Sequence, residues 1–241
     1  MTPLPRYPAD FPVFCIGGSA GAVKGFLALA EALPADFPAP IFFVLHRKNP
    51  GLRRSHHLLQ DLLLSRSKLR VVTPVAGELV RSGRIYLPEP NRHLVVDDNH
   101  LWLPAEPADT PWRPSIDVAF QSIAREFGAR AVAILLSGLL DDGVEGLREV
   151  TREGGITGVQ QPEDAEAPDL PLNGILHDHP SYVMPVADLA AVFCELARHP
   201  YSSDQASVTA RAATRAFQEK RILAQAMNAG SSAIKASVHD Y

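Results

Sequence analysis

Short apolar runs with the length of buried strands alternate along this chain with segments whose apolar residues recur at helical spacing. The pattern fills the first third of the sequence and returns from Ser115 onward. Such alternation predicts an α/β fold, doubly wound, with a mostly parallel sheet and helices on both faces. The expected strands are 12–16, 41–45, 69–73, 131–136 and 156–159, and the expected helices are 22–33, 55–64, 115–127, 143–152 and 187–198.

The pattern of apolar residues changes between residues 83 and 103. Three short apolar runs, 85–87, 94–96 and 101–103, are separated by turn-forming residues, Asn91 and the Asp-Asp-Asn segment 97–99. Short strands joined by such residues are typical of antiparallel hairpins. We therefore expect a small antiparallel hairpin insertion in the parallel domain.

We expect one domain, residues 1–200, followed by a C-terminal helical extension, residues 201–241. The extension is rich in Ala, Ser and Gln, with a helix near 208–229. The two cysteines, Cys15 and Cys194, lie far apart in apolar runs and are expected to be buried without a disulfide.

Composition excludes several classes of protein. Hydrophobic residues make up 46% of the chain and charged residues 21%, as in ordinary soluble domains. The net charge of -4 is spread along the chain without a basic run, so no nucleic-acid partner is expected. No basic start precedes a long apolar run, so we expect no secretory signal, no membrane insertion and a cytoplasmic location.

A glycine-rich segment, residues 17–21 (Gly-Gly-Ser-Ala-Gly), lies between the first expected strand and the first expected helix. Ser19 is thereby placed at the carboxyl end of a strand, where ligands of open α/β sheets bind. The segment fits three interpretations: a plain strand-to-helix turn with Ser19 as helix cap, a phosphate or dinucleotide loop, or a turn that carries a nucleophilic serine.

His46 ends the second expected strand. A dinucleotide site needs a carboxylate there, and the glycine spacing also departs from the dinucleotide fingerprint, so the nucleotide interpretation weakens. If the first two strands are neighbours, His46 shares a sheet edge with Ser19 and can take the proton of its hydroxyl. The alternative is a solvated loop histidine.

Two aspartates follow the strand 131–136. Asp141 or Asp142 can orient the imidazole, and either can instead cap the next helix. The resulting order Ser, His, Asp differs from the Ser, Asp, His order of α/β-hydrolases, although residues 17–21 fit the G-x-S-x-G pattern. An ordinary lipase or esterase fold is therefore excluded.

No cofactor and no metal are expected. Four scattered histidines, His56, His57, His177 and His179, lack the spacing of a ligand set, and solvated side chains are the simpler interpretation.

From Val13 to Phe193 the sequence resembles the catalytic domain of the chemotaxis protein-glutamate methylesterases (CheB). Several ordered blocks carry the resemblance, which makes it specific. They are 16–21 (IGGSAG), 44–46 (VLH), 83–88 (GRIYLP), 93–94 (HL), 113–117 (RPSID), 136–146 (LSGLLDDGVEG), 154–160 (GGITGVQ), 169–171 (DLP) and 183–189 (VMPVADL).

The resemblance implies Ser19 as nucleophile, His46 as general base and Asp142 as the orienting carboxylate. It also implies backbone donors at Ala20 and Leu139 that face the oxyanion. The implied reaction is hydrolysis of a glutamate methyl ester in the cytoplasmic region of a methylated chemoreceptor, with the glutamine amide as a further substrate that the family suggests.

The sequence departs from the family beside this site. The family commonly has Thr where this chain has Ala20, a Met-Gly pair in place of Leu139 and Leu140, and often Thr in place of Ser137. These changes keep a rival hypothesis open: a non-catalytic or retasked signalling module with the same fold. Since the pattern begins at residue 13, we expect no receiver domain here and control by a separate receiver or kinase partner.

Overall fold

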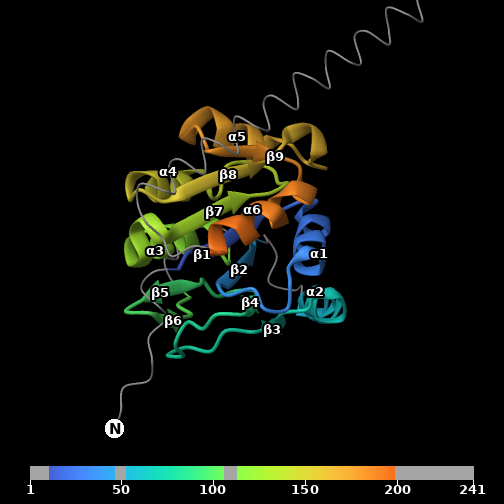
Figure 1. The fold of residues 1–241 in the computed structure, drawn as a ribbon, viewed down its shortest axis with the longest axis vertical. Coiled ribbons are helices and arrows are strands. Elements are labelled where there is room, and N and C mark those ends of the chain that lie inside the picture. Colours follow the sequence, from blue (N-terminus) through green and yellow to red (C-terminus); the bar gives the residue numbers. More distant parts are fainter. Residues whose placement is uncertain (1–10, 47–52, 106–112, 199–241) are drawn as a thin grey trace, which may run out of the picture.

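The computed structural model describes residues 11–46, 53–105 and 113–198. Seven strands form one sheet in the order β3-β4-β2-β1-β7-β8-β9, and every neighbouring pair is parallel (Figure 1). The strands are β1 (Val13–Gly18), β2 (Pro40–Leu45), β3 (Arg70–Val72), β4 (Arg84–Tyr86), β7 (Ala131–Leu135), β8 (Ile156–Gln160) and β9 (Tyr182–Met184). The doubly wound, mostly parallel sheet expected from the sequence is confirmed.

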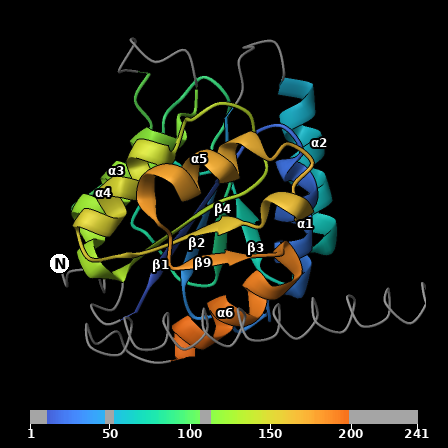
Figure 2. The ribbon, with the colours of Figure 1, turned by 90° about the horizontal axis from the view of Figure 1, so that it is seen from above.

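Helices cover both faces of this sheet. Figure 2, seen from above, shows α3 and α4 on one side and α1 and α2 on the other. The helices are α1 (Ala22–Ala32), α2 (Arg53–Arg66), α3 (Ile116–Phe127), α4 (Val144–Arg152), α5 (Asp169–Asp178) and α6 (Val186–Arg198), with 3₁₀ turns at Gly128–Arg130 and Pro162–Asp164. Among the described helices, none is both long enough and apolar enough to span a bilayer.

The central strand β1 shows why its sequence is continuously apolar. Phe14 and Ile16 pack into the core beneath α1 and α6, whereas Val13 and Cys15 pack into the core beneath α3 and α4. Successive side chains of a strand point to opposite faces, so a strand covered on both sides must be apolar at every position. The expected burial of Cys15 is confirmed, while Cys194 is half-buried.

The antiparallel insertion is also present, but it is smaller than expected. Strands β5 (Val95–Asp97) and β6 (His100–Trp102) form a two-stranded antiparallel sheet around a turn at Asp98 and Asn99, both at positive φ. The expectation was wrong for the run 85–87, because β4 pairs in parallel with β2 and β3 in the main sheet. The residues around this short run predict only a turn on each side, and nothing local indicates that the run pairs with strands distant in the sequence.

Two elements were not expected at all, the helix α5 and the edge strand β9. Helix α5 contains Pro171 and Gly174, which read as breakers. Pro171 lies in the first turn, where its missing N–H has no intrahelical partner to lose. The expected C-terminal helical extension, 201–241, lies outside the described residues.

The register of the three central strands sets the site. Gly18 of β1 pairs with Leu45 of β2, and Gly17 pairs with Leu135 of β7. The chain therefore leaves these three strands at the same level of the carboxyl edge, at Ser19, at His46 and at the loop that follows β7.

Candidate active site

Ser19 lies in a turn that is anchored to the loop after β7. Its backbone N–H donates to the carbonyl of Ser137 at 3.0 Å, and the N–H of Ala22 donates to the carbonyl of Ser19 at 3.2 Å. The Ser19 side chain remains partly exposed while the strand behind it is fully buried. The turn thus presents a fixed hydroxyl to solvent at the edge of the sheet.

Gly21 and Ser137 make this turn compact. Gly21 has a φ of 77°, and a Cβ there would come within 2.6 Å of the Ser137 hydroxyl and of the Glu166 side chain. The Ser137 hydroxyl donates to the carbonyl of Ala20 at 2.7 Å and accepts the N–H of Ala167 at 2.8 Å. Only glycine combines this backbone conformation with such close neighbours, so the turn is held tightly against the loop after β7.

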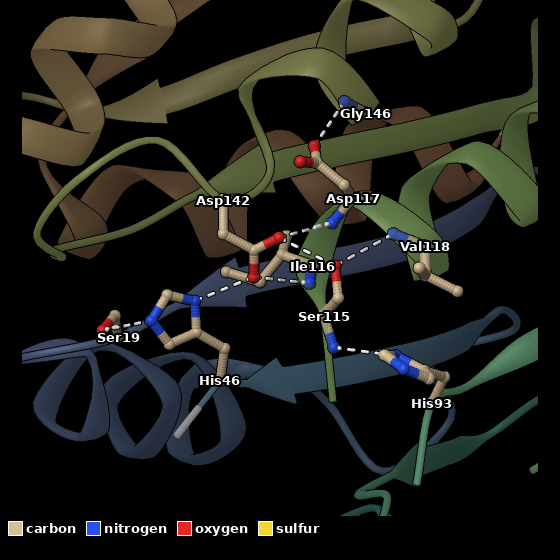
Figure 3. A network of polar contacts seen from close by, with 9 residues as sticks. All are labelled: Ser19, His46, His93, Ser115, Ile116, Asp117, Val118, Asp142 and Gly146. Carbon is tan, nitrogen blue, oxygen red and sulfur yellow. Dashed lines mark hydrogen bonds and ion pairs between the residues drawn. The ribbon is translucent and has the colours of Figure 1, made fainter. Parts of the chain in front are cut away.

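His46 joins the serine to a carboxylate. Its Nε2 lies 3.0 Å from the hydroxyl oxygen of Ser19, and its Nδ1 lies 2.8 Å from Oδ2 of Asp142 (Figure 3). An ionised carboxylate only accepts hydrogen bonds, so Nδ1 carries the proton and Nε2 is left to accept the serine O–H. His46 is 6% exposed and Asp142 is 4% exposed, so the hydrogen bond between them is buried, whereas the bond from Ser19 to His46 is only partly buried.

Asp142 is held by the start of α3. Its Oδ1 accepts the hydroxyl of Ser115 at 2.8 Å and the N–H of Asp117 at 3.2 Å. Its Oδ2 accepts the N–H of Ile116 at 2.9 Å in addition to His46. A carboxylate at a helix N-terminus is stabilised by the unpaired N–H groups and by the helix dipole. These hydrogen bonds hold the Asp142 carboxyl group in one orientation.

Ser115 both caps α3 and supports Asp142. Its hydroxyl accepts the N–H of Val118 at 3.3 Å, as a helix cap does, and it donates to Asp142. Its own N–H donates to Nδ1 of the buried His93 at 3.3 Å (Figure 3). In the sequence, Ser115 stands out only as part of the run 113–117. No spacing in the sequence indicates that this run contacts Asp142.

Asp117 is a further residue that the sequence analysis did not single out. Its Oδ1 accepts the N–H of Gly146 in α4 at 2.7 Å. Burial raises its pKa from 3.8 to about 7, and the nearby charge of Asp142 adds to this rise. A carboxyl group that titrates near neutrality thus lies directly behind the aspartate that contacts His46.

The remaining predicted residues fall as follows. Asp141 is exposed, and the structure places its neighbour Asp142 against His46. No oxygen of the described residues accepts the N–H of Ala20, which follows Ser19, or of Leu139, which follows Gly138. A Cβ on Gly138 would lie 3.1 Å from the Cβ of Ser19. Backbone N–H groups without an internal acceptor can stabilise an oxyanion that forms in front of them.

Across the ranges that the structure describes, no group of three or more His, Cys, Asp or Glu side chains could hold a metal ion. The chemistry that these residues can perform is that of a serine hydrolase: a hydroxyl, a base in hydrogen-bond contact with it, and a buried carboxylate that orients the base. The fold and this arrangement define the class of protein as a doubly wound α/β domain with a serine-hydrolase-type site.

Comparison with known proteins gives the family. The family described as CheB methylesterase matches residues 14–193, and this chain belongs to that family. The crystal structure of the Thermotoga maritima CheB methylesterase catalytic domain superposes with a TM-score of 0.71 at 27% identity, covering 78% of this chain and 99% of that one.

Curated relatives have matching names. A protein-glutamate methylesterase/protein-glutamine glutaminase of Anaeromyxobacter dehalogenans is 32% identical over 194 residues, which is 80% of this chain and 56% of the relative. The protein-glutamate methylesterase FrzG of Myxococcus xanthus is 28% identical over 189 residues, 78% of this chain and 55% of the relative. The chain thus spans a little over half the length of these two relatives.

Proposed function

We propose that this protein hydrolyses glutamate methyl esters in the cytoplasmic region of methylated chemoreceptors, and that it acts in the cytoplasm. The observation that carries the proposal is the unbroken chain of hydrogen bonds from Ser19 through His46 to Asp142, at 3.0 and 2.8 Å, on the fold of the CheB family. The same site accounts for a second substrate, the side-chain amide of glutamine, which differs from the ester only in its leaving group.

The reaction proceeds in two halves. The Ser19 oxygen attacks the ester carbonyl carbon while Nε2 of His46 takes the hydroxyl proton. The tetrahedral intermediate carries its negative charge on the former carbonyl oxygen, opposite the N–H groups of Ala20 and Leu139. When the intermediate collapses, the imidazolium of His46 gives its proton to the leaving oxygen and methanol departs.

Water completes the cycle. His46 takes a proton from a water molecule while the water oxygen attacks the carbonyl carbon of the acyl-enzyme. When this second intermediate collapses, the imidazolium of His46 gives that proton to the leaving Ser19 oxygen. The products are a glutamate carboxylate and free enzyme. Asp142 holds the imidazole in the required tautomer and stabilises the imidazolium in both halves.

The rival function is a non-catalytic or retasked signalling module. This hypothesis rests on the residues Ala20, Leu139 and Leu140, which differ from those common in the family near the nucleophile. These changes alter side chains, whereas the oxyanion donors of the proposal are backbone N–H groups. The hydrogen-bonded Ser19 and His46 therefore favour a hydrolase. Control by a separate receiver or kinase partner is also part of the proposal.

A serine-directed phosphonate separates the two functions. We expect a fluorophosphonate to label Ser19 in the wild type, as read by mass spectrometry of the intact chain and of its peptides. Labelling should fall at least a hundredfold in His46→Ala and be absent in Ser19→Ala. A wild type that resists the reagent while it stays folded would favour the binding module.

A further inference from the structure

Leu140 lies in a backbone conformation that its own side chain does not explain. Its φ of 65° is in the left-handed region, where a residue with a Cβ is disfavoured. The side chain is 52% exposed, so burial in the core does not stabilise this conformation. No acceptor among the described residues takes the N–H of Leu140. Some other contact must therefore hold the residue in this conformation.

A hydrogen bond from α5 provides that contact. The side-chain amide of Asn173 donates to the carbonyl of Leu140 at 2.8 Å. A carbonyl oxygen only accepts hydrogen bonds, so the NH₂ end of the amide faces it. Asn173 lies within α5, and the helical backbone gives this donor a fixed position. The helix thus holds the carbonyl of the strained residue from one side.

The two ends of the loop around Leu140 are held by other contacts. At one end, Gly138 donates its N–H to the carbonyl of Ala167 at 2.9 Å and accepts the N–H of Leu170 at 2.9 Å. At the other end, Asp142 accepts hydrogen bonds from the start of α3 and lies against the imidazole of the base. Both ends are therefore fixed without any help from Asn173.

The middle of the loop, residues 139–141, is held less firmly. In the described part of the chain, its hydrogen bonds are a turn into the start of α4 and the bond from Asn173 to Leu140. This stretch connects Leu139, whose N–H faces the oxyanion in the proposed mechanism, with Asp142. A change of φ at Leu140 would redirect the chain between these two residues, so they could not both keep their places.

We propose that Asn173 is a positioning residue of the active site, which holds Leu140 in the left-handed conformation and thereby keeps the N–H of Leu139 and the carboxyl group of Asp142 in place. The inference rests on the proposed hydrolase function and adds a residue that acts only through this loop. A hydrogen bond and a left-handed leucine have opposing free energies of similar size. Without the bond, Leu140 relaxes toward negative φ, and a smaller fraction of molecules has the catalytic arrangement.

The test measures how fast a fluorophosphonate labels Ser19, because this rate depends on the site and not on which ester is the natural substrate. Mass spectrometry of the intact chain over time gives the second-order rate constant. Asn173→Ala should be labelled about tenfold more slowly than the wild type. Asn173→Asp keeps the size of the side chain but removes the N–H donor, and it should show the same loss.

Leu140→Gly provides a rescue that a purely structural role of Asn173 would not give. Glycine adopts a positive φ without steric cost, so the loop no longer needs the hydrogen bond. Leu140→Gly alone should be labelled within about twofold of the wild-type rate, and the double variant Asn173→Ala/Leu140→Gly should return to the same range. If Asn173 only stabilised α5, the two substitutions would act independently and the loss would persist.

Two controls separate this effect from a loss of folded protein. Alanine has a higher helix propensity than asparagine, so Asn173→Ala should weaken α5 little, and urea denaturation measures the free energy of unfolding of each variant. Leu172→Ala changes the exposed residue next to Asn173 in the same helix, and it should keep the wild-type labelling rate.

The outcomes separate this inference from the function on which it rests. A wild-type rate in Asn173→Ala, a loss that Leu140→Gly does not restore, or an equal loss in Leu172→Ala would overturn the positioning role. A wild type that is not labelled would overturn the hydrolase function and the inference with it. If the wild type is labelled but releases no methanol from methylated receptor fragments, the proposed substrate is wrong, and the labelling rates still decide the role of Asn173.

Discussion

Asp142 accepts hydrogen bonds from the start of α3, and Asp117 accepts one from the start of α4. Asp142 lies just before α4 and accepts the N–H groups of Ile116 and Asp117 at the start of α3. Asp117, within α3, accepts the N–H of Gly146 in the first turn of α4 at 2.7 Å. The two helices and the loop between β7 and α4 are thereby locked together, and the carboxylate that contacts His46 is fixed at their junction.

Replacement of Asp142 by asparagine should nearly abolish activity. The amide must place its NH₂ group against either His46 or the N–H donors of α3, so the imidazole loses the tautomer that accepts from Ser19. We expect kcat to fall by about 10³ to 10⁴. The exposed neighbour provides the control: Asp141→Asn should retain activity within a few-fold, and an equal loss there would contradict the assignment.

Ser115→Ala should lower both stability and activity. It removes the helix cap, which costs about 1 kcal/mol in the free energy of unfolding, and it removes one of the hydrogen bonds to Asp142. Chemical denaturation and kcat measure the two effects. Ser122 is a buried serine of the same helix with two hydrogen bonds of its own. Ser122→Ala should cost stability and spare kcat, and a matching loss of kcat would mean that Ser115 acts only through the stability of α3.

Gly21→Ala should destabilise the protein more than Gly77→Ala does. Both glycines have nearly the same φ, 77° and 80°, so both variants bear the cost of a left-handed backbone, about 1 kcal/mol. A Cβ at Gly77 meets no atom within 4 Å, whereas one at Gly21 meets Ser137 and Glu166 at 2.6 Å. Overpacking should add about 1 to 3 kcal/mol and displace Ser19. If urea denaturation gives the same loss in the free energy of unfolding for both variants, the neighbours of Gly21 move aside without cost and the prediction is wrong.

Asp117→Asn should reduce the pH dependence of stability. The pKa of Asp117 is raised from 3.8 to about 7, so between these values the folded protein holds a proton that the unfolded chain releases. This group therefore makes stability fall as pH rises through that window, with no further loss above it. Thermal melts at pH 5 and pH 8 should differ less in Asp117→Asn than in the wild type. The exposed Asp97→Asn should leave the difference unchanged.

The positions of Ser19 and His46 could be predicted because parallel strands impose a simple geometry. Polar residues that follow buried apolar runs collect at one edge of the sheet, and the pairing of β1 with β2 brings these two together. The choice between Asp141 and Asp142 could not come from the same rule. Both lie in one loop, and which carboxylate faces inward depends on the positive φ values at Leu140 and Gly143.

Other features depend on contacts between distant segments. The run that became β4 is three residues long, and its parallel pairing with β2 and β3 has no local signature. Helix α5 was hidden by Pro171 and Gly174, although Gly174 has a packing reason: a Cβ there would lie 2.8 Å from Val159 of β8. Close approach between elements favours glycine where local helix propensity disfavours it.

The central claim is that Ser19 hydrolyses a glutamate methyl ester on a chemoreceptor. The most direct measurement is methanol release from a methylated chemoreceptor cytoplasmic fragment, with wild type compared with Ser19→Ala. We predict release by the wild type that accompanies the loss of methyl groups from the fragment, and none above background in the variant. Equal release by Ser19→Ala, or none by the wild type with several receptor fragments, would contradict the claim.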